Sequence, residues 1–280
     1  MSHLLKDIAV FFDASDAGRQ ILDCAAQLAG AQQAHLIGIC AASPGEQPPQ
    51  DAYAFGPALE DVAARQQSAR DTQLLQAGQA LAIAAARHDI HAEFRVIPYS
   101  ESGSAAALHA LYCDLLVVAE PAVGTPLSWS TTRMLQTSGV PLLRVPATWH
   151  SETIGRHIVL AWNASRPARR AVADALPLLV TAATVDLLLI DAQPQTGRYG
   201  DDPGADMAAY LARHGVHVEL RSIASHDHSV AEAILAEAGA RHADLIVFGA
   251  YSRLRLSEAV FGGVTRSLLA ASPLPLFVSP

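Results

Sequence analysis

The chain contains an internal repeat, and this repeat limits the folds open to it more than any other feature of the sequence. Several blocks of the first half recur in the same order in the second half. They are Asp7–Ser15 with His157–Ser165, Asp114–Val118 with Asp244–Phe248, Thr132–Arg133 with Thr265–Arg266, and Pro141–Pro146 with Pro275–Pro280. The offsets differ, 165 − 15 = 150 for the first pair and 244 − 114 = 130 for the second, so insertions separate the blocks, as expected for loops. This order indicates a duplicated domain.

Short apolar runs predict the strands. Each is rich in β-branched residues and is followed by a turn signal, which is typical of a strand buried on both faces. The expected strands are 8–12, 35–40, 93–97, 115–119 and 142–145 in the first half, and 158–162, 185–190, 218–223, 245–249 and 276–278 in the second. Helical periods lie between them, such as Ile21, Ala25 and Leu28 on one face. Strands that alternate with helices predict an α/β fold with two tandem, doubly wound, parallel, five-stranded Rossmann-like sheets.

Two features distinguish the first half and the boundary between the halves. A Pro-, Gly- and Gln-rich stretch at 43–57 precedes a long helical run at 59–87, and the second half has a much shorter segment there. The segment 147–153 follows the last strand of the first repeat without a clear period. We therefore predict a linker at this point and domains at 1–148 and 153–280.

Helix signals in the second half are more local. Val172, Leu176 and Leu179 share one helical face, and Pro177 is expected to bend or shorten that helix. Ser229-Val-Ala-Glu232 has the spacing of a capping box, which predicts that a helix begins there.

Charge and composition exclude several classes of protein. The formal net charge is −8, and such a field repels phosphate backbones, so we expect no nucleic-acid partner. The first residues do not have the pattern of a secretory signal, and no apolar run approaches the ~20 residues of a membrane span. We therefore expect a cytoplasmic protein with no membrane partner. Cys24, Cys40 and Cys113 are odd in number and lack CxxC spacing, which predicts reduced, buried thiols.

A ligand crevice is expected beyond the carboxyl ends of the strands, in the loops after the first and fourth strand of each half. In the second half the fourth strand is followed by Gly249-Ala-Tyr-Ser252-Arg253 and then by Gly262-Gly263-Val264-Thr265-Arg266. Glycine beside a helix start lets the backbone approach an anion, and the free N–H groups and the helix dipole hold it. This pattern predicts a phosphate cradle.

The chain resembles the universal stress protein family across both halves. The resemblance rests on these loops, on the Asp-Ala-Ser or Asn-Ala-Ser after the first strand, and on the terminal Pro-Leu-Phe-Val strand. The resemblance implies an adenine nucleotide alpha hydrolase-like fold. It also implies a Gly-x2-Gly-x9-Gly-Ser/Thr motif around the phosphates and an Asp after the first strand near the nucleoside. Family members dimerise through the last strand, so the two halves of this chain are expected to pair in that way as an intramolecular pseudo-dimer.

The second half departs from the binding motif at three positions. Ser252 replaces the middle Gly, Gly263 replaces Ser/Thr, and Asn163 stands in place of the Asp. Ser disfavours positive φ, and Asn keeps hydrogen bonding without the charge. The candidate nucleotide-binding residues are Asn163, Ala164, Ile190, Gly249, Ser252, Arg253, Gly262, Gly263, Val264 and Thr265.

The first half keeps Asp13 but departs further from the motif. Glu120 would repel a phosphate, Pro121 lacks an N–H donor, and Ser128-Trp129-Ser130 replaces the Gly pair. We predict that this half has lost its phosphate site and that Asp13 caps a loop.

Other residue groups that could bind a metal or a base have simpler structural interpretations. His226-Asp227-His228 precedes a capped helix without further metal ligands in view, so a surface turn is favoured over a metal site. Tyr251 and Trp129 could stack on a base or close a loop, and the latter is favoured. No GxxxxGK[ST], GxSxG or HExxH motif is present, so no catalytic residues are assigned.

Three functions remain open. The first is a stress-response protein that acts by binding ATP or AMP in its C-terminal domain. The second is a ligand-free scaffold that binds an unknown protein partner, and the third is a weak nucleotide hydrolase. Further association of tandem chains into a homodimer stays open.

Overall fold

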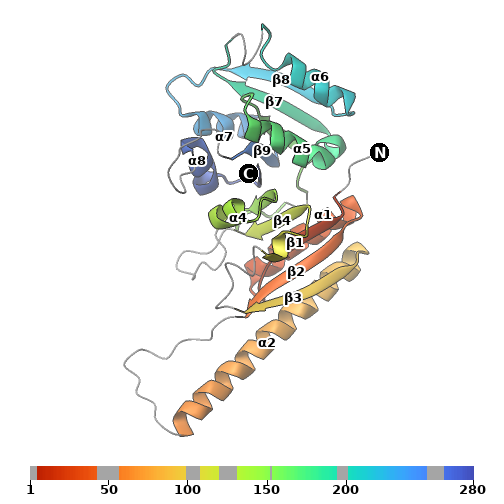
Figure 1. Cartoon of the computed structure of the whole chain (residues 1–280), viewed down its shortest axis with the longest axis vertical. Helices are drawn as coiled ribbons and strands as arrows, with labels where there is room; N and C mark the ends of the chain where they lie inside the picture. The colour runs from red at the N-terminus through yellow and green to blue at the C-terminus, as the bar shows by residue number, and fades with distance from the viewer. Residues whose placement is uncertain are drawn as a thin grey trace.

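The computed structural model describes residues 5–42, 57–98, 108–119, 131–151, 153–193, 201–250 and 262–280. Ten strands in these ranges form one sheet (Figure 1). The strands are β1 Asp7–Phe11, β2 His35–Ala42, β3 Ala92–Pro98, β4 Leu115–Ala119, β5 Leu142–Val145, β6 His157–Ala161, β7 Thr184–Ile190, β8 Val218–Ile223, β9 Leu245–Gly249 and β10 Leu276–Ser279. The helices are α1 Asp16–Gln32, α2 Pro57–His88, α4 Thr131–Thr137, α5 Arg166–Thr181, α6 Ala205–Arg213, α7 Val230–Ala240 and α8 Gly263–Ala271. Every predicted strand is confirmed.

The strand order is β3-β2-β1-β4-β5-β10-β9-β6-β7-β8. Neighbouring strands are parallel within each half, and the halves meet where β5 and β10 pair antiparallel. The two predicted five-stranded sheets therefore exist, and they join into one mixed sheet through the last strand of each half. This is the pairing that the family resemblance implies.

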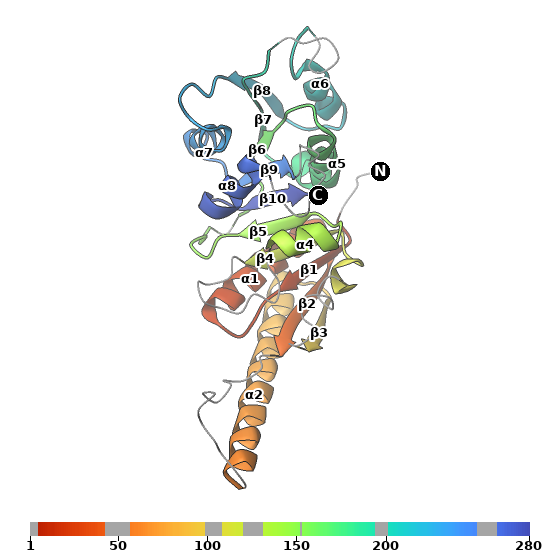
Figure 2. The same ribbon diagram turned by 60° about the vertical axis from the view of Figure 1, so that its left-hand side comes forward.

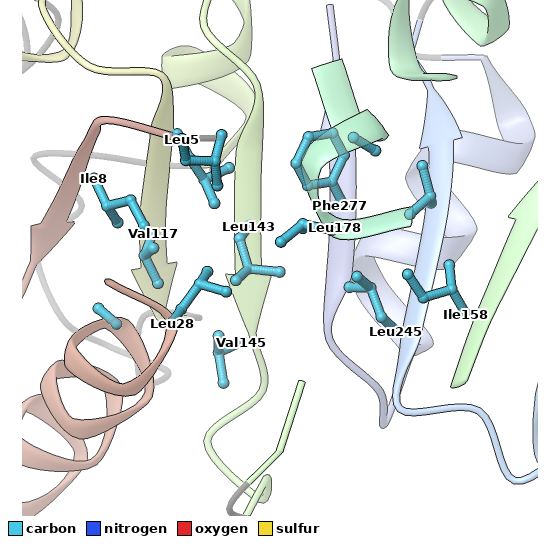
Figure 3. Close-up of a cluster of buried hydrophobic side chains, with 14 of the residues drawn as sticks. Leu5, Ile8, Leu28, Val117, Leu143, Val145, Ile158, Leu178, Leu245 and Phe277 are labelled. Atoms are coloured by element: carbon cyan, nitrogen blue, oxygen red, sulfur yellow. The ribbon is translucent and has the colours of Figure 1, made fainter. Parts of the chain in front are cut away.

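Buried side chains fill the junction between the halves. Leu143 lies opposite Phe277 in the β5–β10 register, and both are at most 1% exposed. Figure 3 shows these two side chains beside Leu178 of α5, between the core of the first half and that of the second. One apolar cluster therefore extends through both halves.

A carboxylate clasp recurs at the same place in each repeat. Asp114 accepts hydrogen bonds from the N–H groups of Lys6 and Asp7, at 2.7 and 3.1 Å. Asp244 accepts from the N–H groups of residues 155, 156 and 157, at 2.9 to 3.1 Å. Each clasp ties the residue before the fourth strand to the start of the first strand of its half, which gives a physical reason for an aspartate at both positions.

The helices follow the predicted faces and caps. Ile21, Ala25 and Leu28 are buried on α1, and the matching α5 face is buried as well. α5 continues four residues beyond Pro177 to Thr181, so the expectation that Pro177 shortens this helix is wrong. The capping box that opens α7 at Ser229 is present.

The long helix α2 confirms the run predicted at 59–87. Its C-terminal part packs on α1, β2 and β3, and its N-terminal part extends away from the sheet (Figure 2). The Pro- and Gly-rich residues 43–56 lie outside the described residues. Residues 146–156 between β5 and β6 contain no described helix or strand, and the domain boundaries stay predictions. No helix in the described ranges is long and apolar enough to cross a membrane.

Candidate nucleotide site

A pocket lies at the carboxyl ends of β6, β7 and β9, where the second half was expected to hold a ligand. Its volume is about 100 Å³, below the ~300 Å³ at which ordinary ligand pockets begin. It is lined by Ala161, Trp162, Asn163, Ala168, Leu188, Ile190, Val230, Ile234, Phe248, Gly249, Val264 and Thr265. Five predicted site residues are therefore brought together, namely Asn163, Ile190, Gly249, Val264 and Thr265.

The remaining predicted site residues have different positions. Ala164 follows Asn163 in the turn before α5, and Gly262 and Gly263 form the start of α8, next to Val264. Ser252 and Arg253 lie outside the described residues, as does Tyr251.

The turn after β6 orients Asn163. Its Oδ1 accepts the N–H of Ser165 at 3.2 Å, while Ala164 takes a positive φ of 53°. The Ser165 hydroxyl in turn accepts the N–H of Ala168 and caps α5. The side-chain carbonyl of Asn163 is thus engaged by its own loop, so Nδ2 is the group with which this residue can donate to a ligand.

Asp13 makes the same turn in the first half. Its Oδ1 accepts the N–H of Ser15 at 2.9 Å and the hydroxyl of the same residue. Ser15 then caps α1 by accepting the N–H of Gly18 at 3.0 Å. This geometry gives Asp13 the loop-capping role that was favoured from the sequence.

Gly249 has a structural reason to be glycine. A Cβ at this position would lie 2.2 to 2.4 Å from backbone atoms of Pro167 and Ala168 at the start of α5. The end of β9 therefore meets the first turn of α5 at a distance that only glycine permits.

Gly262 and Gly263 are in the opposite situation. A Cβ at either would meet no atom of the described residues within 4 Å, and Gly262 has an ordinary φ of −56°. Gly262 makes no side-chain cap, and no described residue accepts the N–H groups of Gly263, Val264 or Thr265. These three amides at the start of α8, together with the helix dipole, can bind an anion.

Apolar side chains at the strand ends form most of the pocket, and these side chains are not among the predicted site residues. Trp162 directly follows β6, Phe248 is the penultimate residue of β9, and Val230 and Ile234 come from α7. In the sequence, the one feature that could have pointed to Trp162 is its position, because it directly precedes Asn163 at the carboxyl edge of the sheet. These walls suit a flat, apolar ring.

One carboxylate stands at the same edge of the sheet. Asp191, directly after β7, accepts the N–H and the hydroxyl of Ser225 at 2.9 and 2.6 Å. The hydroxyl and backbone hydrogen bonds from Ser225 lower the pKa of Asp191. Its charge disfavours phosphate on the β7 side and leaves the α8 side for an anion.

The described lining of the pocket contains no cysteine, histidine or carboxylate. Cys24, Cys40 and Cys113 are free thiols, and burial raises their pKa values to about 11, 11 and 12, which keeps them protonated and unreactive. His226, Asp227 and His228 lie exposed between β8 and α7, with a φ of 49° at His226. Across the described residues, no group of three or more His, Cys, Asp or Glu side chains could hold a metal ion.

The matching loop of the first half cannot be compared directly. Glu120, Pro121, Ser128, Trp129 and Ser130 all lie outside the described residues. The loss of the first phosphate site stays a prediction.

Comparison with known proteins agrees with the duplicated fold. Residues 155–280 match the model of the universal stress protein family. No curated protein sequence matches the chain significantly. A universal stress protein from Archaeoglobus fulgidus DSM 4304 is similar in structure over 98% of this chain and 95% of that one, with 14% identity and a TM-score of 0.67.

A putative universal stress protein from Pseudomonas aeruginosa UCBPP-PA14 is similar over 98% of this chain and 93% of that one, with 15% identity and a TM-score of 0.57. At such identities these likenesses concern the fold, and they extend through both halves. Residues 155–280 therefore match the universal stress protein family, and the chain as a whole shares the fold of these two structures over both halves.

Proposed function

We propose that this chain is a stress-response protein that acts by binding an adenine nucleotide, ATP or AMP, in its C-terminal domain. One observation carries the proposal: predicted site residues from separate segments line one pocket at the carboxyl edge of β6 and β9, and α8, whose first amides have no acceptor among the described residues, begins at its rim. The apolar walls would receive the base, and the N–H groups of Gly263, Val264 and Thr265 would receive phosphate oxygens.

Binding without turnover is the form of activity that the described groups support. The pocket lining includes no carboxylate, histidine, lysine or cysteine among its described residues. Hydrolysis of a phosphoanhydride needs a positioned base or metal-binding carboxylates, and Asn163 and Thr265 supply neither. The proposed role is therefore that of a nucleotide-responsive regulator.

A ligand-free scaffold is the second candidate, and the pocket volume favours it. About 100 Å³ is small for a nucleotide. In this alternative the chain would act through its surface on a protein partner, with no response to nucleotide.

Thermal unfolding of the full chain with and without ATP or AMP separates the two candidates. A nucleotide concentration one hundred times Kd stabilises the native state by ~2.7 kcal/mol, which raises the midpoint temperature of unfolding by several degrees. We expect Gly262→Asp to abolish the shift, because a carboxylate would stand before the α8 amides. Ser128→Asp in the first half should preserve it.

The same samples test turnover through phosphate release, which we expect to be absent. An unchanged midpoint at millimolar ATP and AMP would favour the scaffold. A shift lost in the Ser128 variant but kept in the Gly262 variant would assign the site to the first half.

A further inference from the structure

We propose that the chain has a second small-molecule site, between its two halves, that binds a free amino acid with an apolar side chain. A pocket of about 460 Å³ lies there, within the ~300 to 1,000 Å³ of ordinary ligand pockets. It is lined by Leu5, Cys113, Asp114, Gly139, Val140 and Pro141 of the first half, and by Arg170, Ala173, Asp174, Leu176, Pro177, Tyr210 and His214 of the second.

This pocket is separate from the candidate nucleotide site. Asp114 precedes β4 and Pro141 precedes β5, so the pocket opens at the amino ends of the first-half strands. The candidate nucleotide site lies at the carboxyl ends of the second-half strands. The two pockets share no lining residue.

The floor of the pocket is apolar and one wall is aromatic. Leu5 and Leu176 are 4% and 7% exposed, and Pro141, which also lines the pocket, is buried. The rings of Tyr210 and His214 lie 4.6 Å apart between centroids and 52° from coplanar. An aliphatic or aromatic side chain can be buried against these surfaces.

A paired donor and acceptor stand beside this floor. Arg170 Nε donates to Asp174 Oδ2 at 2.7 Å, and the hydroxyl of Ser279 donates to the same oxygen. Within the described part of the chain, no hydrogen bond reaches Asp174 Oδ1, and no acceptor is bonded to the Nη groups of Arg170. The Asp174 side chain is only 14% exposed, so its charge is poorly screened by solvent.

An amino acid is the ligand class that complements this arrangement. Its carboxylate and its ammonium group are carried by one carbon, so adjacent guanidinium and carboxylate groups can bind both at once. Its side chain would then lie on the apolar floor. A purely anionic ligand would be repelled by Asp114 and Asp174, and a purely cationic one by Arg170.

The duplication explains why this pocket is open. Gln20 of α1 is the counterpart of Arg170 on α5, at the offset of 150 residues that relates Ser15 to Ser165. At that counterpart the linker lies against α1: Gln20 Nε2 is 3.2 Å from Nδ1 of His150, and Trp149 packs against the core. The chain crosses between its halves on the α1 side of the pseudo-dimer, and no described linker residue lines the pocket on the α5 side.

Calorimetric titration of the full chain, without nucleotide, tests the proposal. We expect L-phenylalanine and L-leucine to bind. N-acetyl-L-phenylalanine lacks the ammonium group and L-phenylalaninamide lacks the carboxylate, so each should bind at least about tenfold more weakly, as for the loss of one charged hydrogen bond. Equal binding of either derivative would overturn the assignment to a zwitterion.

Variants locate the site. Ala173 is exposed on α5 and lines the pocket, so Ala173→Trp should fill it and abolish binding. Val180→Trp is the matched control, because Val180 is exposed on the same helix and does not line the pocket. Arg170→Gln should weaken binding about tenfold. Absence of binding by every amino acid, or binding unchanged by Ala173→Trp, would refute the site.

Discussion

The glycines of the candidate site in the second half have two different structural roles. Gly249 is fixed by the scaffold, since its Cα faces backbone atoms of Pro167 and Ala168. An added Cβ at Gly262 or Gly263 would meet no described atom, so no described neighbour requires a glycine there. Of the glycines that resemble a nucleotide-binding motif, one is therefore explained by packing, and we propose that the other two give access to the α8 amides.

Gly249→Ala tests this division. The added methyl group would lie within 2.4 Å of the α5 backbone, so β9 and α5 must move apart, and we expect a loss of at least about 3 kcal/mol in the free energy of unfolding. Urea denaturation measures it. Gly263→Ala is the control and should change stability by less than about 1 kcal/mol. Equal effects of the two substitutions would contradict the assigned roles.

Among the elements, the ends of the strands rather than their middles carry the specific chemistry. Most residues of the inner strands are apolar, with Arg144 on β5 and Asp186 on β7 as buried exceptions, and the two outer strands of the sheet carry several charged residues. Glu93 and Arg95 lie on β3, and Glu219 and Arg221 lie on β8, each with an ion pair between them. Charged side chains on an edge strand discourage pairing with another chain, so the ten-stranded sheet is protected at both ends.

The Asp244 clasp is the element-level contact most open to test. Asp244→Ala removes the acceptor of three backbone N–H groups at the start of β6, and we expect unfolding to cost about 2–3 kcal/mol less. Asp227→Ala, at an exposed loop carboxylate, is the control and should have little effect. Denaturant titrations of both variants decide the matter, and a loss below about 0.5 kcal/mol for the Asp244 variant would show that the clasp is not stabilising.

At the scale of the whole molecule, the antiparallel β5–β10 pair turns two domains into one sheet with a shared core. Ligands of either half are thus bound to a single packed body. A nucleotide at the carboxyl edge of the second half and a small molecule at the junction would each stabilise the same body, so unfolding experiments can report on both sites.

The sequence predicted the strands well because strands buried on both faces are continuous apolar runs, as in 115–119 and 245–249. It predicted that Asn163 and Thr265 lie at the same edge of the sheet because loops at the carboxyl ends of strands have a known place in this fold class, and both line one pocket; their role as ligand contacts stays a prediction. Trp162 was missed because a tryptophan at the end of a strand looks like ordinary core. The junction pocket was missed because Leu5 and Tyr210 come from different halves and no local motif joins them.

The central claim is that the amides at the start of α8 bind a nucleotide phosphate. Backbone ¹H–¹⁵N NMR of the full chain, titrated with ATP and separately with adenosine, tests it directly. We expect ATP to shift the amide signals of Gly263, Val264 and Thr265. Adenosine, which has no phosphate, should leave these three largely unchanged while it shifts residues of the apolar walls. Signals of these three amides that stay unmoved at saturating ATP would show that they do not bind the phosphate.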